Sequence, residues 1–147
     1  MLVIINILLF FLAYHTEVLS ENGIKEIEST IISRISTTLT GKHYKIKAFA
    51  TDNMKYIFKY SKILIPSYEC DEADVVIAGD LLKNKDCEKK VMIVTKYYLI
   101  RKYQNAVAAF YWYKGRPNIV FIKERLEKFG IKLPTEYEKY IDSEKNL

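Results

Sequence analysis

The chain has 147 residues, half of them hydrophobic, and a formal net charge of +5. This composition fits one domain with a buried core and excludes a disordered chain. The positive charge comes mostly from lysine, with only 4 arginines. Lysines spread along the chain indicate a solvated surface, not one that binds nucleic acid.

The first predicted element is a secretory signal peptide. Met1–Ala13 is apolar apart from one asparagine, and it is shorter than the ~20 residues that span a bilayer. Val18 and Ser20 stand where a signal peptidase prefers small residues, which places cleavage after Ser20. We therefore expect a signal peptide over 1–20 and one α/β domain over 21–147, exported to a bacterial periplasm and without a membrane span after cleavage. The alternatives are an uncleaved N-terminal anchor and a buried strand.

The exported part is predicted to begin with an amphipathic helix over 22–40, since isoleucines recur there at steps of three and four. Gly41 ends this helix. Alternating residues predict a strand over 45–50, followed by a short helix over 52–60. One continuous helix over 44–60 fits the same residues.

Three further strands and a helix are predicted in the middle of the chain. A short strand covers 62–65 and ends at Pro66. The apolar runs over 73–78 and 91–95 are typical of buried central strands. A short helix over 96–104 follows them.

The chain has 2 cysteines, Cys70 and Cys87, which precede the two buried strands. In an oxidising compartment an even pair indicates a disulfide, here expected to be a structural bridge with redox sensitivity as a further hypothesis. Closing this loop should contribute roughly 3 kcal/mol to the free energy of unfolding. Two reduced, buried thiols are the alternative.

A β-hairpin is the clearest element of the C-terminal half. Two β-rich runs, 106–113 and 118–122, flank the turn sequence over 114–117. Helices are predicted over 123–130 and over 134–141. All these elements together predict a single-domain α/β sandwich, with helices flanking a mixed sheet of about five to six strands.

The sequence shows no pattern for catalysis, a metal or a cofactor. A lone loop histidine, His43, offers no triad, and the cysteine and histidine spacing matches no zinc site. The 5 glycines are isolated, so no phosphate-binding loop is present. We therefore expect a protein that is not an enzyme.

The hairpin carries the first candidate site. The residues of its first strand divide into Val107, Ala109, Tyr111 and Tyr113 on one face and Ala108, Phe110 and Trp112 on the other. Both faces are apolar, so either helices cover both or one face contacts a partner or a second copy of the chain. Aromatic residues with arginine are common interface anchors. Tyr111, Tyr113 and Arg116 are thus the predicted partner-binding residues, with Trp112 in the core.

A second candidate site lies where the buried strands end. Asp80 follows the first of them, and Thr95 and Lys96 stand at the end of the second. Ligands often bind at strand ends in α/β sheets, so these three residues are expected near a ligand if the protein binds a small solute. Acidic residues at strand ends are also ordinary turn formers and helix caps.

About half of the chain resembles the YfiR-like family of small periplasmic proteins. The segments that carry the resemblance are 73–80, 91–95, 106–122 and 129–141, and Gly130–Leu133 resembles that family's joint before its last helix. The N-terminal half has no counterpart of the family's Trp-Pro pair. The resemblance implies a periplasmic regulator that binds the outer domain of a membrane-bound diguanylate cyclase or sensor kinase. It also implies a tendency to form homodimers.

Overall fold

The computed structural model describes residues 20–147, so the predicted signal peptide over 1–20 lies outside the described residues apart from Ser20. The helices are α2 (Glu21–Thr40), α3 (Ile57–Tyr60), α4 (Tyr97–Lys102) and α5 (Lys123–Lys128). The strands are β1 (Ile46–Ala50), β2 (Leu64–Pro66), β3 (Val75–Ala78), β4 (Met92–Val94), β5 (Ala106–Tyr113), β6 (Arg116–Ile122) and β7 (Ile141–Asp142).

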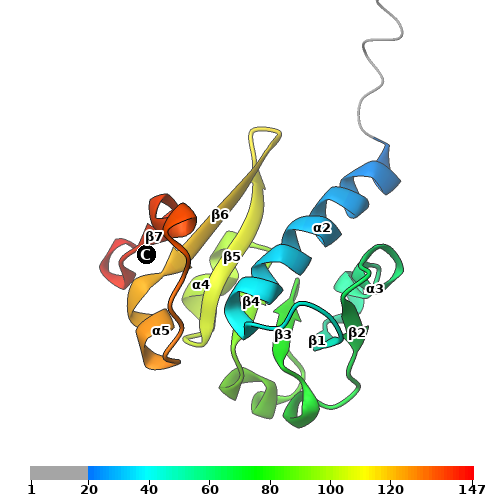
Figure 1. Ribbon diagram of the computed structural model, residues 1–147, viewed down its shortest axis with the longest axis horizontal. Coiled ribbons are helices and arrows are strands. Elements are labelled where there is room, and N and C mark those ends of the chain that lie inside the picture. Colours follow the sequence, from blue (N-terminus) through cyan, green and yellow to red (C-terminus); the bar gives the residue numbers. More distant parts are fainter. Residues whose placement is uncertain (1–19) are drawn as a thin grey trace, which may run out of the picture.

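These strands form one mixed sheet in the order β2-β1-β3-β4-β5-β6-β7 (Figure 1). Strands β1 to β5 are parallel, β6 returns antiparallel to β5, and β7 pairs parallel with β6. The predicted α/β class with a mixed sheet is confirmed. The sheet has seven strands, slightly more than the number expected.

Helix α2 covers one face of the sheet, as its apolar spacing predicts (Figure 1). Ser20 accepts a hydrogen bond from the Gly23 amide at 3.2 Å, and Gly41 ends the helix in the left-handed region. Glu28 then fixes α2 to the sheet. Its carboxylate accepts the Trp112 indole N–H at 2.6 Å and also the Tyr56 hydroxyl.

The segment after α2 forms a strand, so the continuous helix over 44–60 is wrong. Strand β1 pairs with β2 on one side and β3 on the other, and its residues alternate between buried and less buried positions. This alternation buries Ile46, Ala48 and Ala50 on one face of a strand that is paired on both sides. The helix predicted over 52–60 forms only as a 3-10 turn, Asp52–Met54, and the one-turn helix α3.

The second face of the sheet is covered differently from the first. Helix α4 lies there, but two crossovers contribute only 3-10 turns: residues 67–74 link β2 to β3, and residues 79–91 link β3 to β4. We call them the first and second crossover. A disulfide between Cys70 and Cys87 joins them, with 5.1 Å between the Cα atoms. The predicted bridge is therefore present.

The predicted hairpin is present as β5 and β6, but its turn is shorter than 114–117, since only Lys114 and Gly115 form it and β6 begins at Arg116. Both residues have positive φ angles, 49° and 72°, as a type I′ turn requires. The face of the sheet predicted for Val107 is wrong. Met92 pairs with Ala106 and the next β4 residue pairs with Ala108, so a bulge turns Val107 into the core on the α2 side.

The C-terminal end differs from the prediction of a helix over 134–141. Thr135–Tyr140 is a 3-10 turn, and β7 follows it. Ile141 pairs with Phe121 of β6 and packs against the α2-side core. This edge pairing and the apolar contact of Ile141 stabilise the C-terminal end against the sheet. Between residues 20 and 147, no helix has both the length and the apolar character needed to cross a membrane.

Candidate functional site

The hairpin brings the predicted partner-binding residues onto one face. Tyr111 and Tyr113 alternate along β5, and Arg116 is the cross-strand neighbour of Tyr113. The ring of Tyr97, from α4, meets Tyr111 edge-on with 5.2 Å between ring centroids. We call Tyr97, Tyr111, Tyr113 and Arg116 the tyrosine patch.

The side chains of the tyrosine patch are partly exposed. Tyr113 is 59% exposed and Tyr97 is 38% exposed, whereas Tyr111 is half-buried. Burial raises the pKa of the Tyr111 phenol, and the nearby Tyr97 and Tyr113 raise it further, so the phenol keeps its proton as a donor. The Lys114 ammonium lies 5.3 Å from the Tyr113 ring centroid. The patch therefore offers apolar area, hydroxyl donors and positive charge on a paired strand.

Sequence reasoning missed Tyr97 as a member of this patch. It belongs to α4, which precedes β5 and packs beside it, so its contact with Tyr111 depends on tertiary structure. The only sequence signal is the position of Tyr97 at the start of a short amphipathic segment. That signal alone does not distinguish a core tyrosine from an exposed one.

A cleft of about 510 Å³ lies at the carboxyl ends of β1, β2 and β3. Asp80 lines it, as the solute-binding alternative expected. Thr95 and Lys96 do not line it, because β4 ends beside the cleft and not within it. The Thr95 hydroxyl instead contacts the Met54 sulfur at 3.4 Å. Of the three predicted ligand residues, Asp80 lines this cleft, whereas Thr95 lies next to the end of β3, where its amide donates to the Ala78 carbonyl at 3.0 Å.

The edge of this cleft is built tightly around Gly79, which follows β3. Its amide donates to Thr51 Oγ1 and its carbonyl accepts from Asn53 Nδ2, both at 2.9 Å. A Cβ at Gly79 would lie 2.6 Å from the Met54 side chain, so a larger residue does not fit without displacement. This glycine allows the turn after β1 to close onto the end of β3.

Residues with possible catalytic or metal-binding chemistry stand apart from both sites. His43 lines a shallow groove of about 720 Å³ beside α2, together with Ser61 and Lys132. Asp74 accepts Lys42 Nζ at 2.7 Å and the Lys47 amide at 2.9 Å, which is a structural use of that carboxylate. Across residues 20–147, no three His, Cys, Asp or Glu side chains gather in a way that could hold a metal ion.

The tyrosine patch thus holds Tyr111, Tyr113 and Arg116 close together on the hairpin. Its arrangement can bury aromatic area and donate hydrogen bonds, which is the chemistry of an interface. Comparisons of the chain with family models, with curated proteins and with solved structures found no match to it.

Proposed function

We propose that this protein is a non-enzymatic regulator that works in the periplasm. It binds the extracytoplasmic domain of a membrane-bound signalling protein, such as a diguanylate cyclase or a sensor kinase. The observation that carries the proposal is the tyrosine patch, which presents an exposed aromatic side chain beside an arginine on a paired strand. Tyrosine and arginine are enriched among the residues that dominate interface energies.

The shape of the tyrosine patch favours a macromolecular partner over a small one. Three of its residues belong to the hairpin and one to α4, and they line neither the cleft near β1 nor the groove beside α2. A flat surface leaves most of a small ligand in water, whereas a protein partner covers it. The tight turn at Lys114 and Gly115 fixes the geometry before binding, which lowers the ordering cost.

The location in the periplasm has separate support. The Cys70–Cys87 disulfide is compatible with an oxidising compartment. The apolar segment Met1–Ala13 is typical of an export signal. The resemblance to YfiR-like proteins agrees with both features and suggests the kind of partner.

Replacing Tyr113 with alanine tests the proposed interface. We expect Tyr113→Ala and Arg116→Ala each to weaken capture of the membrane signalling protein by about tenfold or more, since each truncates an interface anchor. Tyr113 is 59% exposed, so the melting temperature should stay within a few degrees of wild type. The measurement is co-purification from cross-linked native cells, followed by titration of the isolated partner domain.

Tyr44→Ala is the matched control, because Tyr44 is 71% exposed and lies in the loop before β1, outside the patch. It should bind the partner as wild type does. Equal binding by wild type and Tyr113→Ala would contradict the proposed interface. Conversion of a dimer to a monomer by Tyr113→Ala, with partner binding unchanged, would instead assign the patch to a second copy. An intact Met1 in the cytosol would contradict the periplasmic location.

A further inference from the structure

The order of the strands creates a crevice at one place in the sheet. From β1 the chain moves outward to β2 on one side and then returns to β3 on the other side. In parallel α/β sheets, the crevice outside the carboxyl ends of strands at such a reversal is the usual ligand position. The cleft of about 510 Å³ lies at this position, and its volume is within the range of small-molecule sites.

The two crossovers form opposite walls of the cleft. Ser67 and Tyr68 belong to the first crossover, and residues 80–84 belong to the second. Three apolar side chains also line the cleft, Phe49 from β1, Phe58 from α3 and Leu82 from the second crossover. Because the crossovers contain only short 3-10 turns, no helix fills this space between them.

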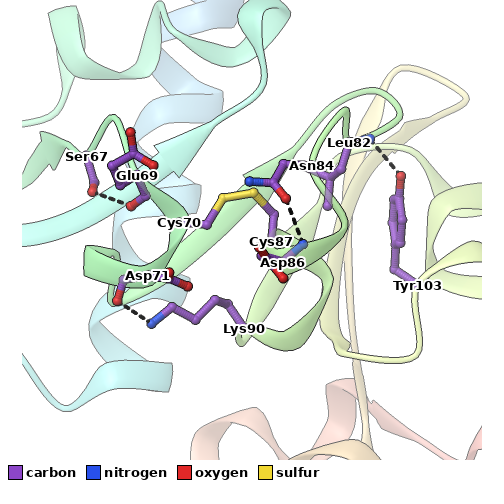
Figure 2. The surroundings of a disulfide bond; sticks show 10 residues. All are labelled: Ser67, Glu69, Cys70, Asp71, Leu82, Asn84, Asp86, Cys87, Lys90 and Tyr103. Atoms are coloured by element: carbon purple, nitrogen blue, oxygen red, sulfur yellow. Dashed lines mark hydrogen bonds between the residues drawn. A yellow bond between two sulfur atoms is a disulfide. The ribbon is translucent and has the colours of Figure 1, made fainter.

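The disulfide and a hydrogen bond from Lys90 Nζ to the Asp71 carbonyl at 3.0 Å link the two crossovers, and further hydrogen bonds anchor each crossover separately (Figure 2). Cys70 and Cys87 join the crossovers a few residues beyond the cleft. The Leu82 amide donates to the Tyr103 hydroxyl at 2.7 Å, and Ser67 Oγ donates to the Glu69 carbonyl at 2.8 Å. A ligand entering a preformed cleft does not need to order its walls, which favours binding.

Two lysines and two aspartates line the cleft, and both lysines meet at one of these aspartates. The Asp52 carboxylate is shared by two ammonium groups, Lys55 at 2.8 Å and Lys83 at 3.8 Å. Both lysines are exposed, so their remaining N–H donors are available to a second anion. The other acid in the lining, Asp80, has one oxygen turned back to accept the Leu81 amide at 2.8 Å.

We propose that this cleft binds a small organic acid with an aromatic body and one carboxylate. The aromatic body lies against Phe49, Phe58 and Leu82, and the carboxylate accepts hydrogen bonds from Lys55 and Lys83. This inference goes beyond the proposed regulatory function, because the cleft and the tyrosine patch share no residue.

Phenylacetate is a suitable probe, because it has an aromatic body and one carboxylate. Titration of the ¹⁵N-labelled 21–147 domain, with its disulfide intact, should shift the amides of residues 51–55 and 81–84 saturably. The double variant Lys55→Ala/Lys83→Ala should raise the dissociation constant about tenfold or more. The neutral analogue 2-phenylethanol should bind wild type about tenfold more weakly than phenylacetate.

The control variant is Lys102→Ala/Lys123→Ala, which removes the same charge from exposed positions on α4 and α5. It should bind phenylacetate as wild type does. The proposal is wrong if phenylacetate produces no saturable shift at about 10 mM, a concentration at which even weak specific sites fill. It is also wrong if both lysine double variants lose affinity equally, since the effect would then report net charge and not the cleft.

Discussion

Arg125 is a charged side chain that the fold buries, with 5% of its surface exposed. Its Nη1 donates to the backbone carbonyls of Ile100 at 2.7 Å and of Tyr103 and Ala106 at 3.0 Å. Its Nε and Nη2 donate to Glu144 Oε1 at 3.2 and 3.0 Å. A single guanidinium thus links the end of α4, the start of β5 and the C-terminal segment.

Removal of this side chain should be costly. We expect Arg125→Ala to lower the free energy of unfolding by about 3 kcal/mol, because the buried carbonyls lose their donor while Glu144 remains partly hydrated. Urea unfolding followed by circular dichroism measures the change. Arg101→Ala, at an exposed position on α4, is the control and should change stability by less than about 0.5 kcal/mol. A loss under about 1 kcal/mol for Arg125→Ala would contradict the structural role.

At the residue scale, sequence reasoning succeeded where neighbours in the chain define the arrangement. Tyr111, Tyr113 and Arg116 are close because strand alternation and a short turn place them on one face. Lys55 and Lys83 were not predicted as residues of the cleft, since they follow different strands and meet only through Asp52. No local sequence pattern predicts that two lysines so far apart in the chain contact the same carboxylate.

Among the elements, the C-terminal segment is held by few contacts, and Glu124 supplies one group of them. The Glu124 carboxylate, in the first turn of α5, accepts the Ser143 hydroxyl at 2.6 Å and the Glu144 amide at 2.8 Å. The hydrogen bond from Ser143, then that from the Glu144 amide, lowers the pKa of Glu124 from 4.5 to about 2. The ionised carboxylate therefore favours the docked segment.

This pKa predicts acid release of the C-terminal segment. Because the docked pKa lies below the ordinary value of 4.5, the stabilisation by Glu124 is fully present above that pH and is lost as the pH falls toward about 2. The protection factor of the Glu144 amide, measured by NMR hydrogen exchange and corrected for the intrinsic rate at each pH, should fall over that interval. Glu124→Gln should exchange faster already at neutral pH, whereas Glu127→Gln, exposed on the same helix, should behave as wild type. Unchanged protection in Glu124→Gln would contradict this role.

The predictability of an element depended on its length and periodicity. Helix α2 has several turns of apolar spacing with a cap at each end, and the hairpin has two long β-rich runs, so both were predicted correctly. β7 has only two residues, Ile141 and Asp142, and forms because the edge of β6 is free beside it. That reason lies in the tertiary structure, as does the bulge that turns Val107 inward.

At the scale of the whole molecule, the two faces of the sheet are stabilised by different means. One face is covered by the long helix α2, whereas the other has α4 and two crossovers with only 3-10 turns. Cys70 is 4% exposed and Cys87 is fully buried, so the bridge occupies the place that crossover helices fill in most parallel sheets. The disulfide therefore stabilises the face of the sheet that the two crossovers cover without a helix.

Loss of the bridge should thus destabilise the entire domain. We expect Cys70→Ala/Cys87→Ala to lower the free energy of unfolding by roughly 3 kcal/mol, because the unfolded chain regains the freedom of the closed loop. Urea unfolding of the variant, compared with oxidised and reduced wild type, separates the bridge from the packing of the sulfur atoms. Reduced wild type should match the variant. Because both sulfurs are buried, reduction should accelerate as urea opens the domain. Equal unfolding midpoints for the oxidised and reduced protein would show that the layer is stable without its covalent link.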